Sequence, residues 1–256
     1  MNAFRRQCIE HGFFSKKQCF FRCIGDGVYQ TIRVNESCYV DPVSPYYSTY
    51  RRRSRRVVLG LYSIYAHLPE DWFNPRFGAG LIDARNIIGC KGNTFLGFQD
   101  HVAIMESHGF DYLDRIVTQR KLVDAVEELS AFQPSLRSDQ MMCVPYYLCH
   151  DMEQAKRIVD SFFSNEASMK WCMEKRENDP KAELKQRVFS EWLALSEALK
   201  SETKMKRYIH ENLVRNLGYA KQYGLPLTIN TEMGQLRGGT DLGQGTVNAK
   251  KEGVRP

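Results

Sequence analysis

Signatures of several well-known enzyme and membrane-protein classes are missing from this sequence. It contains no G-x-x-x-x-G-K-[ST] phosphate loop, no G-x-G-x-x-G fingerprint, no G-x-S-x-G elbow and no H-E-x-x-H zinc motif. No apolar run approaches the roughly 20 residues of a membrane-spanning helix, and the first residues lack the apolar core of a signal peptide. We therefore expect a cytoplasmic protein with no membrane contact, no cofactor and no bound metal, and no recognised enzyme class is indicated.

The composition excludes disorder of the whole chain. Of 256 residues, 43% are hydrophobic and 26% are charged, which is typical of a globular protein that can bury a sizeable core. No internal repeat of fixed period is visible, so a solenoid or propeller is not expected.

The eight cysteines do not predict a disulfide framework, because nothing in the sequence directs the chain to an oxidising compartment. Their spacing does not predict zinc either. Only Cys19 and Cys23 are close in sequence, and on a strand residues four apart are about 13 Å from one another. We expect reduced thiols at all eight positions, which are Cys8, Cys19, Cys23, Cys38, Cys90, Cys143, Cys149 and Cys172.

The net charge of +6 is unevenly distributed. Residues 1–60 carry 11 lysines and arginines against 4 acidic residues, which leaves 25 against 26 for the remainder of the chain. The excess of positive charge therefore lies in the first quarter of the sequence. It is consistent with a nucleic-acid contact, with an acidic protein partner, or with a solvated face.

The first 100 residues are patterned mainly as strands. Helical spacing of apolar residues predicts a short helix over residues 2–12. A Gly-Asp-Gly turn predicts an antiparallel hairpin of residues 18–24 and 28–34. Residues 35–45 are expected to form a loop, and the strands that follow are predicted at residues 56–66 and, in a short form, at residues 81–88.

After Asp100 the pattern becomes helical. Apolar spacings of three and four predict a helix from His101 that Gly109 interrupts, and a continuation to Leu129. Length does not decide between strand and helix for residues 141–148. Three amphipathic helices complete the ordered part, at residues 151–165 with Asp151 as N-cap, at 181–200, and at 204–223 before a Gly224 stop.

The predicted fold class is therefore α+β, with an N-terminal helix and antiparallel sheet followed by a helical C-terminal half. Residues 1–99 are expected to form the sheet-containing region, and residues 100–228 a helical region packed on or beside it. Residues 229–256 are glycine-rich and have no apolar period, and they are predicted to be a disordered tail.

Four segments resemble a bacterial family known as domain of unknown function 4304. They are H-G-F-F-S-K-K-Q-C-F-F-R at 11–22, Y-Q-T-I-R-V at 29–34, H-G-F-D-Y-L at 108–113 and H-E-N-L-V-R-N-L-G-Y-A-K-Q-Y-G-L at 210–225. The family begins with a short helix, a lysine pair and an aromatic-rich strand, so the resemblance implies an α+β fold. Some of its relatives are regarded as immunity-like or toxin-linked proteins, which implies a binding role. The family supplies no catalytic residues to transfer, and the arginine run departs from its pattern.

Two local clusters have the residue types of an active site. Cys149, His150 and Asp151 offer a thiol, an imidazole and a carboxylate, but adjacent residues rarely face one another, and a buried Cys149 with Asp151 as an N-cap is the simpler interpretation. The second cluster would suit a divalent ion only if its members converged, and first-turn carboxylates that complement a helix dipole explain it without metal. Its members are Glu106, His108, Asp111 and Asp114.

The segment of residues 46–56 is the most distinctive part of the sequence. Its tyrosines and arginines suit bidentate pairing with the carboxylates of an acidic protein partner, or stacking and phosphate contacts on RNA or single-stranded DNA. A third interpretation is neutralisation within the fold by Glu70, Asp71 and Asp83. We predict a non-enzymatic binding module, immunity-like or regulatory, that contacts an acidic protein partner; the alternatives are RNA or single-stranded DNA binding and a hydrolase with an unrecognised site. The predicted partner-binding residues are Tyr46, Tyr47, Tyr50, Arg51, Arg52, Arg53, Arg55 and Arg56.

Overall fold

The structure is a computed structural model that describes residues 2–40, 51–75, 82–89, 98–132, 140–174 and 179–227. The predicted tail, residues 229–256, lies outside these ranges. The strands and the short elements between them are β1 (Phe14–Lys16), β2 (Cys19–Ile24), β3 (Val28–Val40), β4 (Arg51–Ser63), η1 (Glu70–Trp72), β5 (Ile82–Asp83) and η2 (Ala84–Ile88). The α-helices are α1 (Asn2–Glu10), α2 (Phe98–Ile104), α3 (Phe110–Arg115), α4 (Gln119–Leu129), α5 (Cys143–Leu148), α6 (Met152–Ser164), α7 (Glu166–Met173), α8 (Ala182–Ala198) and α9 (Glu202–Gln222).

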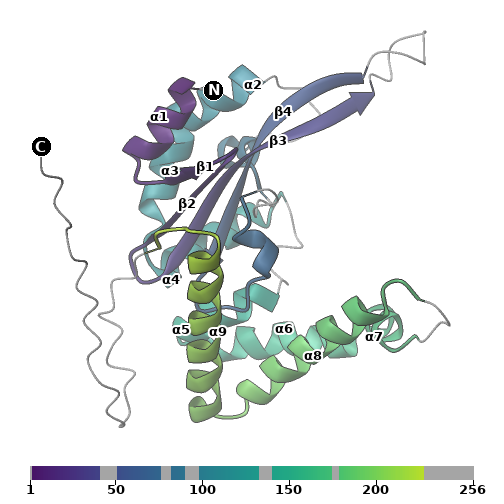
Figure 1. Ribbon diagram of the computed structural model, residues 1–256. Helices are drawn as coiled ribbons and strands as arrows, with labels where there is room; N and C mark the ends of the chain where they lie inside the picture. The colour runs from purple at the N-terminus through teal and green to yellow at the C-terminus, as the bar shows by residue number, and fades with distance from the viewer. Residues whose placement is uncertain are drawn as a thin grey trace, which may run out of the picture.

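The fold is α+β, as predicted. Helix α1 precedes a sheet of order β1-β2-β3-β4-β5, in which every neighbouring pair is antiparallel. The helices that follow the sheet in sequence pack around and below it (Figure 1). The predicted hairpin is confirmed as β2 and β3, with Ile24 opposite Val28 across the Gly-Asp-Gly turn.

Strands β3 and β4 are longer than the sequence indicated. Residues 35–40, predicted as loop, continue β3, and β4 begins at Arg51 instead of residue 56. The two strands pair without interruption from Val28 opposite Ser63 to Val40 opposite Arg51. The prediction was wrong because it treated the arginines as a boundary, whereas backbone pairing with β3 extends the strand through them.

One face of the sheet packs against the first helices. Phe4 of α1 contacts the ring of Phe20 in β2 at 5.8 Å and the ring of Phe110 in α3 at 6.2 Å. Phe20 lies opposite Ile32 in the β2–β3 register, and both are buried. These apolar contacts hold α1 and α3 against this face.

The other face is covered by residues 64–75 and by α9. Tyr29 of β3 stacks on Phe73 with ring centroids 5.1 Å apart, and Phe73 contacts Tyr219 of α9 at 5.8 Å. The buried Asn216 amide donates to the carbonyls of Ile64 and Ala66 at 2.7 and 2.8 Å. Both faces of the central strands are therefore buried, which explains why β2 and β4 lack a simple alternation of polar and apolar residues.

The β2–β3 turn docks on the link between α3 and α4. The Asp26 amide donates to the Val117 carbonyl at 3.1 Å, and the Asp26 carboxylate accepts from the Gln119 amide at 3.1 Å. The Gln119 side chain donates back to the Asp26 carbonyl at 3.1 Å. The predicted turn thus also joins the sheet to the helical half of the chain.

Several helical predictions need correction. Gly109 does not interrupt the first helix, because a π-helical turn, η3 (Met105–Gly109), carries the chain from α2 into α3. Residues 143–148 are helical, the predicted fourth strand is limited to β5 because η2 begins at Ala84, and β1 and α7 were not anticipated. Two predicted caps are confirmed, since the Asp151 side chain accepts from the Gln154 amide and Gly224 has a φ of 62°.

In the described part of the chain, no helix combines the length and the apolar character needed to cross a membrane.

Candidate functional site

The predicted arginine segment forms one strand of a β-ribbon, which we call the basic arm and define as residues 35–40 of β3 and 51–56 of β4. Five of the six residues 51–56 are arginines. The register pairs Arg51 with Val40 at one end of the arm and Arg56 with Asn35 at the other. Figure 1 shows this end of the β3–β4 pair extending beyond the helices that cover the rest of the sheet.

The structure describes the predicted binding residues to different extents. Arg56 has an exposed side chain, at the base of the arm. Arg51, Arg52, Arg53 and Arg55 are described by their place in β4. The three tyrosines of the prediction lie outside the described residues, and they are Tyr46, Tyr47 and Tyr50.

Two of the acidic residues considered as internal partners of the arginines have other partners. Asp83 binds the Arg85 guanidinium through both carboxylate oxygens, at 2.9 and 2.8 Å. Glu70 accepts hydrogen bonds from the Gln222 amide at 2.8 Å and from the Tyr223 hydroxyl at 2.9 Å. These contacts weaken the interpretation that the run is neutralised inside the fold.

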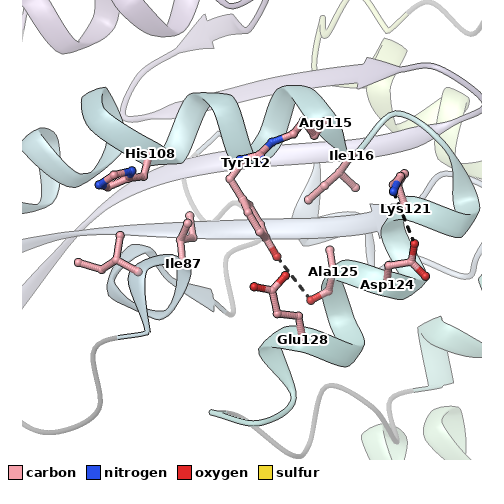
Figure 2. A pocket seen from close by; sticks show the side chains of 10 residues that line it. Ile87, His108, Tyr112, Arg115, Ile116, Lys121, Asp124, Ala125 and Glu128 are labelled. Atoms are coloured by element: carbon pink, nitrogen blue, oxygen red, sulfur yellow. Dashed lines mark hydrogen bonds and ion pairs between the residues drawn. The ribbon is translucent and has the colours of Figure 1, made fainter.

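A notch of about 600 Å³ lies between the π-helical turn, α3, α4 and η2. In Figure 2 the Tyr112 side chain crosses it from α3 toward Ala125 and Glu128 of α4. The Tyr112 hydroxyl donates to the Ala125 carbonyl at 3.5 Å, and burial and the Glu128 carboxylate raise the pKa of this phenol. The wall also includes His108, which the π-helical turn carries.

The charges around the notch are of both signs. Arg115 and Lys121 lie near Asp124 and Glu128, and Lys121 is 3.9 Å from Asp124. Tertiary packing of α3 against α4 creates this arrangement, so no local sequence pattern indicates it. The mixture favours no single class of charged ligand.

The predicted acidic and histidine cluster is not brought together at this notch. Of its four members only His108 lines the wall. Asp114 instead pairs with the Arg22 guanidinium at 2.7 Å and with the His11 ring at 2.7 Å. Among the residues that the structure describes, no three histidines, cysteines or carboxylates group closely enough to hold a metal ion.

A second hollow, of about 790 Å³, adjoins Cys149 and His150. It lies where the β2–β3 turn, the first turns of α4 and α9 and the α5–α6 junction meet. Tyr147, Leu148 and Met152 give it an apolar wall. Sequence reasoning missed this hollow because its charged members come from the β2–β3 turn, α4 and α9, and they are Asp26, Arg120, Glu202 and Lys206.

Cys149, His150 and Asp151 do not form a nucleophile and base in this hollow. The Cys149 thiol packs against the core, and burial raises its pKa, which favours the unreactive protonated form. Asp151 caps α6, and His150 is exposed with a φ of 63° at the end of α5. The Cys149 carbonyl accepts from the Arg120 guanidinium at 3.1 Å, and the Asp151 carboxylate accepts from the Gln154 amide at 3.0 Å.

No protein-family model matches the chain, and searches of the curated proteins and of the solved structures give no significant match. The resemblance to domain of unknown function 4304 therefore stays a prediction. The fold and the basic arm together define an α+β protein from which an arginine-rich β-ribbon projects (Figure 1).

Proposed function

We propose that this protein is a binding module whose basic arm contacts an acidic partner protein. The observation that carries the proposal is the position of the arginines. They occupy one strand of the basic arm, which extends past the helices that cover the rest of the sheet (Figure 1). Guanidinium groups pair with carboxylates in a bidentate geometry, which gives both affinity and orientation. Arginine at a protein interface also loses less hydration energy than lysine on burial.

The proposal predicts that binding to an acidic polypeptide depends on the arm. A fluorescent poly-glutamate peptide serves as the probe, and its affinity is measured by anisotropy. Replacing the five arginines by glutamine should weaken binding at least about ten-fold, which corresponds to roughly 1.4 kcal/mol. The replaced residues are Arg51, Arg52, Arg53, Arg55 and Arg56.

A matched variant removes the same number of exposed cations from α6, α9 and the α8–α9 connection. It should bind the probe within about two-fold of the parent protein, because exposed charges farther than a Debye length of about 8 Å are screened. Equal losses in the two variants would show that net charge alone drives binding and would contradict the proposal. The control replaces Lys156, Arg157, Lys200, Lys204 and Arg207 by glutamine.

Nucleic acid is the second candidate partner, and one observation favours it. Successive positions of a strand alternate between its two faces, so the arginine positions of β4 are divided between both faces of the ribbon. A two-stranded ribbon also fits the major groove of a duplex. This candidate predicts binding of oligothymidine or a short duplex that weakens steeply between about 50 and 200 mM salt. No binding of either oligonucleotide at the lower salt would eliminate it.

A further inference from the structure

Strand β4 has an outer edge that is paired over only a short length. Among the described residues, its only strand partner on that side is β5, through Val58 opposite Asp83 and Leu59 opposite Ile82. Asp83 then caps η2, which turns the chain away from the strand direction at Ala84. Residues 51–56 of β4 pair with β3 on the inner side, and no strand of the described chain pairs with their outer side. Val57, the next residue, is buried and ends this edge.

An unpaired edge presents every second backbone N–H and C=O to an incoming strand. Extended peptides use such edges in β-strand addition, in which the backbone supplies affinity and the side chains supply selectivity. On β4 the edge coincides with the arginine run. Like charges directly opposite one another destabilise a strand pair, so this edge disfavours pairing with a second copy of itself and favours an acidic strand.

We propose that the acidic partner binds as an extended segment that adds to the outer edge of β4 along residues 51–56. This inference rests on the proposed function, because it names the form in which the acidic partner binds the arm. The partner segment carries glutamate or aspartate at alternate positions, which face the same side of a strand as every second arginine position.

The outer edge of β4 suits this partner better than the outer edge of β3. In the described chain, β2 pairs with β3 only as far as Arg33, so residues 35–40 also lack a neighbouring strand on that side. A strand added there would be about 4.8 Å from Glu36 and its neighbours, and nearly twice as far from the arginine strand. At that distance, about a Debye length at physiological salt, the attraction of the arginines for exposed carboxylates is largely screened.

The test compares three synthetic peptides of one sequence, in which glutamate alternates with threonine. One has a normal backbone, and the other two carry N-methyl groups at the odd or at the even positions, so that each keeps the charge but lacks the N–H groups of one edge. Both methylated peptides are needed, since only one edge of the bound peptide faces β4. We expect one methylated peptide to bind at least about ten-fold more weakly than the normal peptide.

Hydrogen exchange of the full chain supplies the second readout. Bound to the normal peptide, alternate amides among residues 51–56 should exchange at least about ten-fold more slowly, because they become hydrogen-bonded. Equal affinity for all three peptides with unchanged exchange at these residues would overturn strand addition. If the arginine-to-glutamine variant still lost binding, the proposed function would nevertheless stand as a contact by charge alone.

Two other results are decisive. If no acidic peptide binds, the strand-addition proposal and the acidic-partner function are both wrong, and oligothymidine binding by the same samples would favour nucleic acid. If the chain alone sediments as a dimer whose residues 51–56 are already protected, a second copy occupies the edge and the inference is overturned.

Discussion

Gly25, the first residue of the β2–β3 turn, is exposed but closely approached by another part of the backbone. Its φ is 56°, and a Cβ built on it would lie 1.6 Å from the Val117 carbonyl oxygen. Alanine at this position would have to move the turn away from the α3–α4 link and break the hydrogen bonds of Asp26 with Val117 and Gln119.

We expect Gly25→Ala to lower the free energy of unfolding by about 3–4 kcal/mol, from the left-handed backbone and from the loss of these three hydrogen bonds. Gly12→Ala is the matched control, because Gly12 has a φ of 76° and nothing within 4 Å of its Cβ position. It should cost only about 1–2 kcal/mol. Urea denaturation measures both, and similar losses would show that contact with Val117 is unimportant.

Gln30 is a buried polar residue whose side chain joins the sheet to α3. It accepts from Arg22 Nε at 2.8 Å and donates to the carbonyls of Leu113 and Ile116 at 2.9 and 3.0 Å. Gln30→Met keeps the volume but removes the partner of Arg22 Nε and the side-chain donor of the Ile116 carbonyl. The Leu113 carbonyl still accepts from the Ile116 amide at 3.1 Å. We expect a loss of about 3 kcal/mol, since each unsatisfied buried group costs roughly 1–3 kcal/mol.

Adding Arg22→Met to that variant also removes one of the polar groups that Gln30→Met leaves without a hydrogen-bond partner. The double variant should therefore lose less than the sum of the two single losses in a double-mutant cycle. A Gln30→Met protein within about 1 kcal/mol of the parent would contradict the assigned role of this network.

At the scale of elements, helix α5 ends in a motif that normally uses glycine. The Asp151 amide donates to the Tyr146 carbonyl and the His150 amide to the Tyr147 carbonyl, both at 2.9 Å. His150 occupies the left-handed position with a φ of 63°. Glycine avoids the steric cost of that conformation.

We expect His150→Gly to raise the free energy of unfolding by about 0.5–1 kcal/mol, after allowing for the greater flexibility of glycine in the unfolded chain. The same substitution at His210, inside α9, should lower it by about 1 kcal/mol. Thermal unfolding of the two variants should shift in opposite directions, and a loss of stability in both would disprove the strain at His150.

Elements with strong local signals were predictable from the sequence, and those that depend on partners were not. The α1 helix, the β2–β3 hairpin and the caps of α6 and α9 depend on nearby residues, and each is present. The outer half of β4 has no apolar alternation, and it is a strand because β3 pairs with it. The π-helical turn and the two hollows likewise arise from packing between elements, which a single sequence does not display.

The candidate site was likewise predictable from the sequence only in its local features. The sequence identified the arginine run as the distinctive feature, but it did not indicate the ribbon that carries the run beyond the body (Figure 1). It also offered Cys149 with His150 and Asp151 as neighbours in sequence, although a cap and a core contact account for two of them. Composition can identify charge, whereas convergence of side chains requires the tertiary structure.

For the whole molecule, a partly buried histidine links the segment after β4 to the last two helices. His67 is 21% exposed and lies 3.8 Å from Glu191 of α8. Burial, together with the charges of Arg215 and Arg187, lowers its pKa from 6.5 to about 4. The folded protein therefore favours neutral His67, while the unfolded chain takes up a proton below pH 6.5.

Because the unfolded state binds more protons between about pH 6.5 and 4, the fold should lose stability as the pH falls through that range. At roughly 1.4 kcal/mol per pKa unit, His67 accounts for up to about 3 kcal/mol of this loss. His67→Gln should reduce the loss by that amount in urea denaturation at successive pH values, whereas the exposed His210→Gln should leave it unchanged. Since burial raises the pKa of Glu191 and so favours the fold at low pH, the comparison is made at each pH between variant and parent. If the parent and His67→Gln lose stability in parallel on acidification, His67 is not a source of the acid sensitivity of the fold.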